Sequence, residues 1–268
     1  MVPSVELTGT AGDGRSLHMN ATNLSESLSF LRGSTIAESM IRNLDQVEAA
    51  AARTGRETLL HVNHPNYKWG ITAEGLAAVV PERFFEVWNG VDNDNDPGDA
   101  TRPNTDVIWD TANALRITRY QAPPLFGLAT DDSHDHHDNK TRAVPGRAWV
   151  MVRATHLSSD TLVRAIRNGD FYSTTGVTLT DMTFTKATGQ LALRIEPSSN
   201  EQFSTRFVGS RKGRPPGETF AEMQGLTPTY KLRGDELYVR AIVVSTGKPT
   251  VESTEFPTKR AWTQPVGG

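Results

Sequence analysis

The segment LFGLATDDSHDHHDN, residues 125–139, decides the fold that we expect for this chain. It begins with an apolar run typical of a buried strand and then changes to acidic residues and histidines. In an α/β sheet or barrel, such a loop at the carboxyl end of a strand carries the chemistry. Asp132 and His134 are two residues apart, so both can face one side of an extended segment. Carboxylates and neutral imidazoles together suit Zn, Mn or Fe(II); the alternative interpretation is a solvated acidic loop with incidental histidines.

The pattern on either side of this segment divides the chain near Gly176. Up to that residue, predicted strands alternate with stretches that carry apolar residues at helical spacing, which favours βα units around a parallel sheet or barrel. After it, apolar residues alternate with a period of two between turn residues, which predicts a small antiparallel β unit. We therefore expect a β/α domain over residues 1–176 and a β-rich domain over residues 177–268.

Composition excludes several classes of site and partner. The net charge of −3 gives no indication of a nucleic-acid surface, and no apolar run reaches the roughly 18 residues of a membrane span. With no cysteine in the chain, any metal must be held by His, Asp or Glu. The sequence opens without a recognisable signal peptide, and the compartment stays open.

Three further residues upstream of the segment could bind a metal. Glu6 lies in a short predicted strand and is either exposed at a sheet edge or a ligand. His18 also lies in a strand, where a lone histidine is either a core residue or a ligand. His61 and His64 are three residues apart, so on a strand they face opposite sides, and Pro65 leaves His64 at the exit, the better place for a ligand.

A second acidic group fails as a calcium loop. Asp92, Asp94 and Asp96 have the spacing of an EF-hand, but Pro97 stands where that loop needs glycine, and Pro103 where it needs glutamate. At most a weak or adventitious ion is expected there. Nucleotide-binding glycine loops and the G-x-S-x-G elbow of serine hydrolases are absent from the sequence.

The candidate ligands occur in an order that resembles the PHP family, the polymerase and histidinol phosphatase metallohydrolases. The matching pieces are V-E-L-T with Glu6, L-H-M-N with His18, N-H-P-N with His64, and D-D-S-H with Asp132 and His134. Two later segments, PGRAWVMVRA at 145–154 and LVRAIRNGDFYSTTGV at 162–177, look like the carbaryl hydrolase-like branch of that family.

The resemblance implies a fold, a cofactor and an activity. The fold would be an α/β, distorted seven-stranded β/α barrel of PHP type, here partial, followed by the antiparallel β unit. Glu6 would bridge two divalent metals, with His18 and His64 completing one position, Asp132 binding the other bridged metal, and His134 belonging to a third. A metal-activated water would be the nucleophile on a phosphate, carboxylic or carbamic ester, and no side chain is assigned as catalytic.

The chain also departs from the family pattern. The family begins with a strand carrying His-x-His and a second carrying Asp-His, and neither precedes Glu6. We expect an N-terminally truncated member, or else a natural variant that has lost catalysis. The alternatives to an enzyme are a non-catalytic metal-binding module and a binding protein that acts through its β tail, where Trp262 is the only tryptophan. If the first strands are absent, residues 2–8 become an exposed edge of a parallel sheet through which oligomers can form.

Candidate contacts for a small-molecule substrate share polar character and a predicted place in loops or at strand exits. They are Asn66, Lys68, Asn89, Arg102, His136 and His137. Lys68 or Arg102 could hold a phosphate group; the alternative is that each is simply a surface charge.

Overall fold

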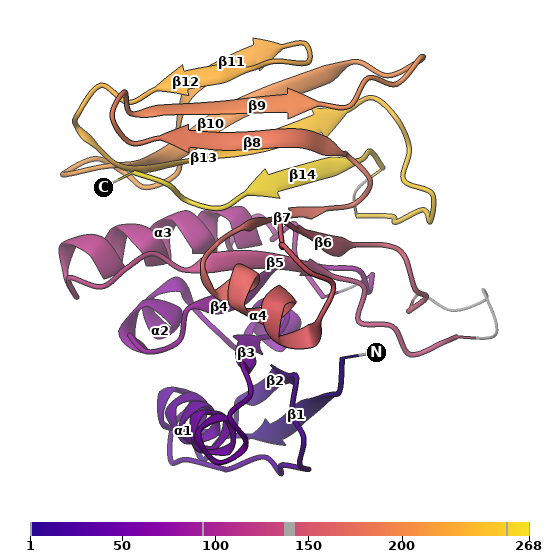
Figure 1. The fold of residues 1–268 in the computed structure, drawn as a ribbon. Helices are drawn as coiled ribbons and strands as arrows, with labels where there is room; N and C mark the ends of the chain where they lie inside the picture. Colours follow the sequence, from indigo (N-terminus) through magenta and orange to yellow (C-terminus); the bar gives the residue numbers. More distant parts are fainter. Residues whose placement is uncertain (1, 93, 137–142, 256, 268) are drawn as a thin grey trace.

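The computed structural model describes residues 2–92, 94–136, 143–255 and 257–267, and the strands of this part form three sheets (Figure 1). The first is a five-stranded sheet in the order β1-β2-β3-β4-β5. Its strands are β1 (Ser4–Thr10), β2 (Ser16–Thr22), β3 (Leu59–Val62), β4 (Phe84–Asn89) and β5 (Phe126–Thr130). Its helices are α1 (Ile36–Thr54), α2 (Ala73–Ala78), α3 (Thr105–Thr118) and the short 3₁₀ turn η1 (Tyr67–Trp69).

The other two sheets form the upper part of the molecule in Figure 1. One has the order β11-β10-β13-β14-β7-β6 and the other β12-β9-β8. Their earlier strands are β6 (Trp149–Val152), β7 (Phe171–Thr174), β8 (Leu179–Thr185) and β9 (Gln190–Ile195), with α4 (Ser159–Arg167) between β6 and β7. The later strands are β10 (Phe203–Arg211), β11 (Glu218–Gln224), β12 (Thr229–Lys231), β13 (Glu236–Ser245) and β14 (Arg260–Thr263).

The expected β/α barrel is wrong. None of the three sheets closes in the part of the chain that the structure describes, and strands far outnumber the four α-helices found there. Only β3, β4 and β5 run parallel, because β1 and β2 form an antiparallel hairpin and β2 is also antiparallel to β3. The edge strand β1 therefore lies in antiparallel rather than parallel pairing, and oligomer formation through it stays a prediction.

A pair of side chains explains why the sheet stops at β5. The backbone N–H of Gly127 donates to Gln264 Oε1 at 2.9 Å, and Gly127 O accepts from Gln264 Nε2 at 2.9 Å and Ser173 Oγ at 2.8 Å. These groups satisfy a strand edge that a further strand would otherwise pair. Strands β6 and β7 instead continue the second sheet, where β7 is antiparallel to β14. That sheet thus contains strands from both sides of Gly176, and the proposed division into domains at that residue stays a prediction.

Local sequence explains where the long helix begins and ends. Thr35 is the N-cap of α1: its hydroxyl accepts from the backbone N–H of Glu38 at 3.2 Å. The Ser34 hydroxyl donates to the Glu38 carboxylate. Gly55 ends the helix in a left-handed conformation with φ of 69°. The apolar face of α1 is buried against the five-stranded sheet.

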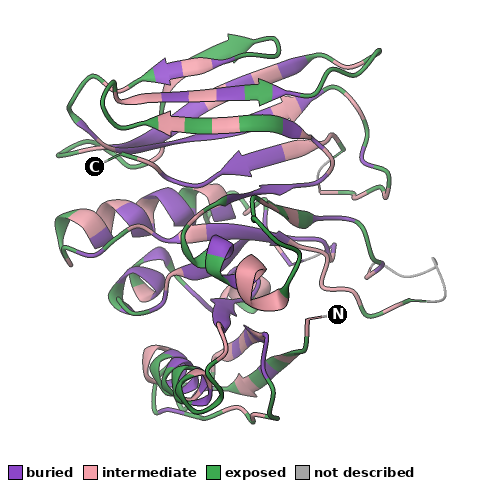
Figure 2. Ribbon diagram, viewed as in Figure 1, coloured by how far each residue is buried: buried purple, intermediate pink, exposed green. Residues whose placement is uncertain are grey.

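Buried residues occur in all the layers, as Figure 2 shows, and the buried apolar side chains of the described residues form three clusters. One cluster joins β1–β5 with α1–α3 and reaches Ile242 and Trp262 of the carboxy-terminal strands. Trp262 is only 1% exposed, so it cannot serve as a stacking platform for a ligand of the β tail. No helix within the described residues is long and apolar enough to cross a bilayer.

A buried ion pair ties α3 to β13. The Arg240 guanidinium donates to Asp110 Oδ1 at 2.9 Å and to Oδ2 at 2.8 Å, and also pairs with Asp106 at 2.9 Å. Tyr238 donates to Asp110 Oδ1 at 2.7 Å. Arg240 and Tyr238 are fully buried, so their donor groups cannot be solvated by water. The Asp110 carboxylate accepts hydrogen bonds from both and carries the negative charge that balances the buried guanidinium.

Asp110→Ala should destabilise the protein by about 3 kcal/mol, since it leaves a buried guanidinium with reduced compensation. Urea unfolding at neutral pH measures this. Asp45→Ala, at an exposed position of α1, is the control and should change stability by less than about 0.5 kcal/mol. Equal effects of the two substitutions would contradict the role given to Asp110.

Glu82 should make stability depend on pH. Its side chain is 1% exposed, and burial raises its pKa to about 8 although the N–H groups of Phe84 and Arg83 donate to it. The folded state then keeps a proton that the unfolded state loses above its ordinary pKa near 4.5. Between these two pKa values the unfolded state binds fewer protons than the folded state. The free energy of unfolding should therefore fall as pH rises from about 5 to 8.

Glu82→Gln removes this ionisation, and the variant should become more stable than the original chain as pH approaches 8. Each unit of pKa difference is worth about 1.4 kcal/mol, so the change is measurable by urea unfolding at a series of pH values. Glu74→Gln, exposed on α2, is the matched control. A constant stability difference between the Glu82 variant and the original chain from pH 5 to 8 would contradict the prediction.

Candidate metal centre

The two ligand candidates of the amino-terminal hairpin lie side by side because of its register. Thr8 pairs with His18 across β1 and β2, and Glu6 lies two residues before Thr8, on the same face. Glu6 and His18 are therefore diagonal neighbours, with His18 Nδ1 3.1 Å from Glu6 Oε1. The hydrogen bond from His18 lowers the pKa of Glu6 and outweighs the opposing effect of burial.

His64 enters from the exit of β3. Its backbone N–H donates to Glu86 Oε2 at 2.7 Å, which fixes the chain just beyond the strand. The His64 ring lies edge-on to that of His18, with centroids 4.8 Å apart, and 5.1 Å from the ring of Tyr67. The expectation that His61 faces away from the site is wrong: it pairs with Asn20, which pairs with Glu6, so it lies on the same sheet face as Glu6. His61 is buried with its Nε2 3.4 Å from Glu86 Oε1.

Asp132 and His134 come from the loop after β5. Asp132 has a φ of 44°, a left-handed conformation that aspartate tolerates better than most residues. Its Oδ2 accepts from Asn89 Nδ2 at 3.3 Å, and its carbonyl oxygen lies 2.7 Å from His134 Nδ1. The His134 side chain is 63% exposed, so it lies at the mouth of the site.

The five predicted ligands converge. Potential ligand atoms of Glu6, His18 and His64 lie within 4.8 Å of one another, and so do those of Glu6, Asp132 and His134. A third group with the same limit comprises His64, Asp132 and Asp94. Because the groups share members, they make one continuous cluster of imidazoles and carboxylates.

Asp94 was considered from the sequence only as part of a failed calcium loop, and its place among the metal-ligand candidates was not predicted. It is 6% exposed, and its Oδ2 is buried without a hydrogen bond from any described residue. Burial, followed by the charges of Asp132 and Glu86, raises the pKa of Asp94 to about 7. Burial and the neighbouring charge of Glu86 also raise the pKa of Asp132. Carboxylates crowded in this way are stabilised by a cation.

The acidic loop that carries Asp94 does not form a calcium site around its three aspartates, which point to different partners. Asp96 Oδ2 accepts from the backbone N–H of Asn89 at 2.6 Å. Asp92 pairs with Arg147 at 3.3 Å and accepts from the Ser253 hydroxyl at 2.9 Å. The loop is therefore anchored on both sides of Asp94.

Glu86 is a fully buried carboxylate beneath the cluster. It accepts from His64 N at 2.7 Å, from Asn89 Nδ2 at 2.9 Å and from Thr130 Oγ1 at 2.7 Å. Burial alone would raise the pKa of Glu86, but the interactions with His61, His64 and Asn89 outweigh it and lower the pKa to about 2. Glu86 thus holds a permanent negative charge behind the candidate ligands and orients them. Glu86 was not among the residues predicted for the site.

Two of the predicted substrate contacts are committed to internal hydrogen bonds. Asn66 is buried and donates to the carbonyl oxygens of Asn95 and Pro103, so it holds a loop. Asn89 is buried and positions Glu86 and Asp132. Neither is free to contact a substrate without losing these bonds.

The charged and imidazole candidates lie nearer the surface. The Lys68 ammonium lies 4.8 Å from the ring of Tyr67, which itself contacts His18 and His64. Arg102 lies over the ring of Trp69 at 4.6 Å. His136 is exposed, and His137 lies outside the described residues. Of these candidates, Lys68 is the one that lies beside the cluster: it contacts Tyr67, and Tyr67 contacts the two site histidines.

Comparison with known proteins gives little that bears on function. No family model matches the sequence, and no curated protein matches it. Among solved structures, the chain is similar to a two-domain protein from Bacteroides vulgatus described as containing a predicted PHP-like metal-dependent phosphoesterase. The identity is 11%, the TM-score is 0.38, and the match covers 99% of this chain and 74% of that one. The function must be argued from the geometry of the site.

Glu86→Gln should weaken metal binding by roughly 10- to 100-fold, the usual effect of losing a group that orients ligands. It should also lower stability by about 2 kcal/mol, because an amide N–H₂ would face a site crowded with donors. Calorimetric titration with Zn²⁺, under conditions where urea unfolding shows the variant to be folded, measures the first effect. Glu48→Gln, exposed on α1, is the control; unchanged affinity in the Glu86 variant would show that Glu86 does not orient the ligands.

Proposed function

We propose that this protein is a metal-dependent hydrolase that acts on phosphate esters, with carboxylic or carbamic esters as the alternative substrates. The observation that carries the proposal is the convergence of Glu6, His18 and His64 from three different segments, with ligand atoms within 4.8 Å of one another. Asp132, His134 and Asp94 extend the same cluster.

The donor set fits a divalent transition metal. Imidazole nitrogen and carboxylate oxygen suit Zn, Mn and Fe(II), and the described cluster contains both types in every group of three. The unpartnered, buried Oδ2 of Asp94 supports the same conclusion, since a buried carboxylate oxygen is costly without a donor or a cation. His18, His64 and Glu6 would hold one ion, and either Glu6, Asp132 and His134 or His64, Asp94 and Asp132 would serve a neighbouring position.

When bound, a divalent metal polarises an ester or phosphoryl oxygen and lowers the pKa of water to near neutrality. The chain's own residues orient the reactants. Glu86 and Asn89 fix the positions of His64 and Asp132. His134, whose side chain is 63% exposed, lies where solvent and substrate can reach the cluster.

A cation beside the cluster favours phosphate esters over neutral ones. Lys68 lies on the ring of Tyr67, and Tyr67 contacts both site histidines. An ammonium at this place can pair with a phosphate oxygen of the substrate. Neutral carboxylic or carbamic esters, such as those suggested by the carbaryl hydrolase-like resemblance, carry no charge with which the Lys68 ammonium could pair.

Metal binding is tested first. The metal-free protein should bind Zn²⁺, Mn²⁺ or Fe²⁺, and His18→Ala or His64→Ala should each weaken binding by at least about tenfold, since each removes a ligand. Calorimetric titration gives affinity and stoichiometry. His156→Ala removes an exposed histidine outside the cluster and should leave the affinity unchanged. Equal metal affinity of all three variants would contradict the proposed metal site.

Turnover is tested next with p-nitrophenyl phosphate, bis-p-nitrophenyl phosphate, p-nitrophenyl acetate and an aryl carbamate. We expect phosphate ester hydrolysis that a chelator abolishes and added metal restores. Lys68→Gln should raise KM for the phosphate ester and leave that for the neutral acetate unchanged. Tight metal binding without hydrolysis of any of these esters would favour the non-catalytic metal-binding module instead.

A further inference from the structure

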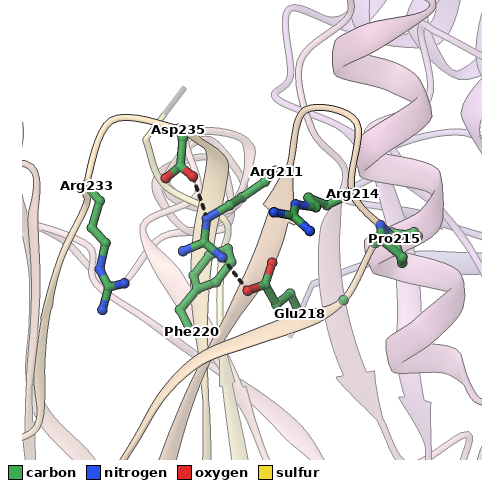
Figure 3. A pocket seen from close by; sticks show the side chains of 9 residues that line it. Arg211, Arg214, Pro215, Glu218, Phe220, Arg233 and Asp235 are labelled. Carbon is green, nitrogen blue, oxygen red and sulfur yellow. Dashed lines mark hydrogen bonds and ion pairs between the residues drawn. The ribbon is translucent and has the colours of Figure 1, made fainter.

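A cavity of about 620 Å³ opens at one end of the carboxy-terminal β unit, away from the strands that carry the metal cluster. Three arginines line it: Arg211 at the end of β10, Arg214 in the β10–β11 turn and Arg233 in the β12–β13 turn. Figure 3 shows the guanidinium groups of Arg233, Arg211 and Arg214 in sequence across the cavity. The volume is within the range of small-molecule sites.

Arg211 is held rigidly at the centre. Its guanidinium lies 4.2 Å from the ring of Phe220, which stacks on Tyr230 with centroids 5.7 Å apart. Glu218 and Asp235, the two carboxylates that line the cavity, both pair with Arg211. The buried Glu236 lies 3.3 Å from the same guanidinium, so three carboxylates pair with Arg211 and balance its charge.

Arg214 and Arg233 have no such compensation. Neither guanidinium makes a hydrogen bond or ion pair within the described part of the chain, yet both backbones are restrained. Arg214 precedes Pro215, which restricts it to extended conformations. The backbone N–H of Arg233 donates to the buried carboxylate of Glu236 at 2.8 Å. Two guanidinium groups without an ion-pair partner among the described residues thus lie on either side of Arg211, whose own charge is balanced by carboxylates.

The local charge agrees with an anionic ligand. Residues 211–218 and 231–236 carry five Lys or Arg against three Asp or Glu, in a chain whose net charge is −3. Arginine binds phosphate oxygens through paired N–H donors, and preorganised donors lose little entropy on binding. The cavity is large enough for a ligand that reaches both outer arginines.

We propose that this cavity binds a phosphorylated small molecule, with Arg214 and Arg233 as the residues that contact its phosphate groups and Arg211 as the fixed cation between them. The site is independent of the metal centre, whose described members come from β1 and from the segments of β2 to β5. It gives the β unit a ligand-binding role of its own.

Inorganic pyrophosphate is the probe, because its two phosphate groups can reach two arginines. Calorimetric titration of the metal-free protein should show one site per chain. Arg214→Gln and Arg233→Gln should each lower the affinity by about tenfold or more, as expected for the loss of a charged hydrogen bond. Both positions are exposed, so the variants should fold normally.

Three matched controls separate this site from weaker explanations. Lys212→Gln removes an exposed charge from the same turn without lining the cavity, and Arg32→Gln removes one elsewhere; each should change the affinity by less than about twofold. Lys68→Gln tests for binding at the metal centre and should also have no effect. Failure to bind pyrophosphate at about 1 mM, or an equal loss in the Lys212 or Lys68 variant, would overturn the proposal and leave the proposed hydrolase untouched.

Discussion

The buried carboxylate of Glu86 is the constraint on which the arrangement of the centre depends. A fully buried charge is tolerated only when donors surround it, and here the donors come from three chain segments: the exit of β3, the end of β4 and the end of β5. Satisfying one carboxylate therefore fixes three strand ends relative to one another. His64, Asn89 and the loop that begins after Thr130 take their positions from that requirement. The candidate metal ligands lie on the solvent side of the Glu86 carboxylate.

Part of this site could be predicted from the sequence, because local rules apply to it. Pro65 follows His64 at the exit of β3, and Asp132 and His134 follow the end of β5, where ligands were expected. Strand alternation did not apply to either pair, since His61 lies on the face of Glu6 and Asp132 has a left-handed backbone. The contribution of Asp94 could not be predicted in the same way. Its loop matches no motif, and the loop is held by Asp96, which bonds to the nearby Asn89, and by Asp92, which bonds to the distant Arg147 and Ser253. Whether these residues bind a metal stays a prediction.

The error in the fold has a different origin. Alternating strand and helix patterns do not reveal which strands pair, since pairing depends on residues far apart in the sequence. The chain forms the hairpin β1–β2 where a βα unit was expected. Strand β7 pairs with β14, more than 80 residues later in the sequence, and β6 pairs with β7. The side chain of Gln264 hydrogen-bonds to the backbone of Gly127 and so occupies the free edge of β5. Ordered ligand motifs can therefore be placed together on a sheet without the closed barrel that the resemblance implied.

The connection between β13 and β14 contributes to the centre through contacts that the two-domain interpretation did not anticipate. Ser253 and the backbone N–H of Thr254 both donate to Asp92 Oδ1, at 2.9 Å and 3.2 Å. The other oxygen of Asp92 pairs with Arg147, which also donates to the carbonyl oxygen of Gly90 at 2.7 Å. Gly90 directly follows β4, and Asp94 lies two residues after Asp92. The position of the Asp94 carboxylate in the cluster thus depends on the carboxy-terminal unit as well as on the sheet that supplies the histidines.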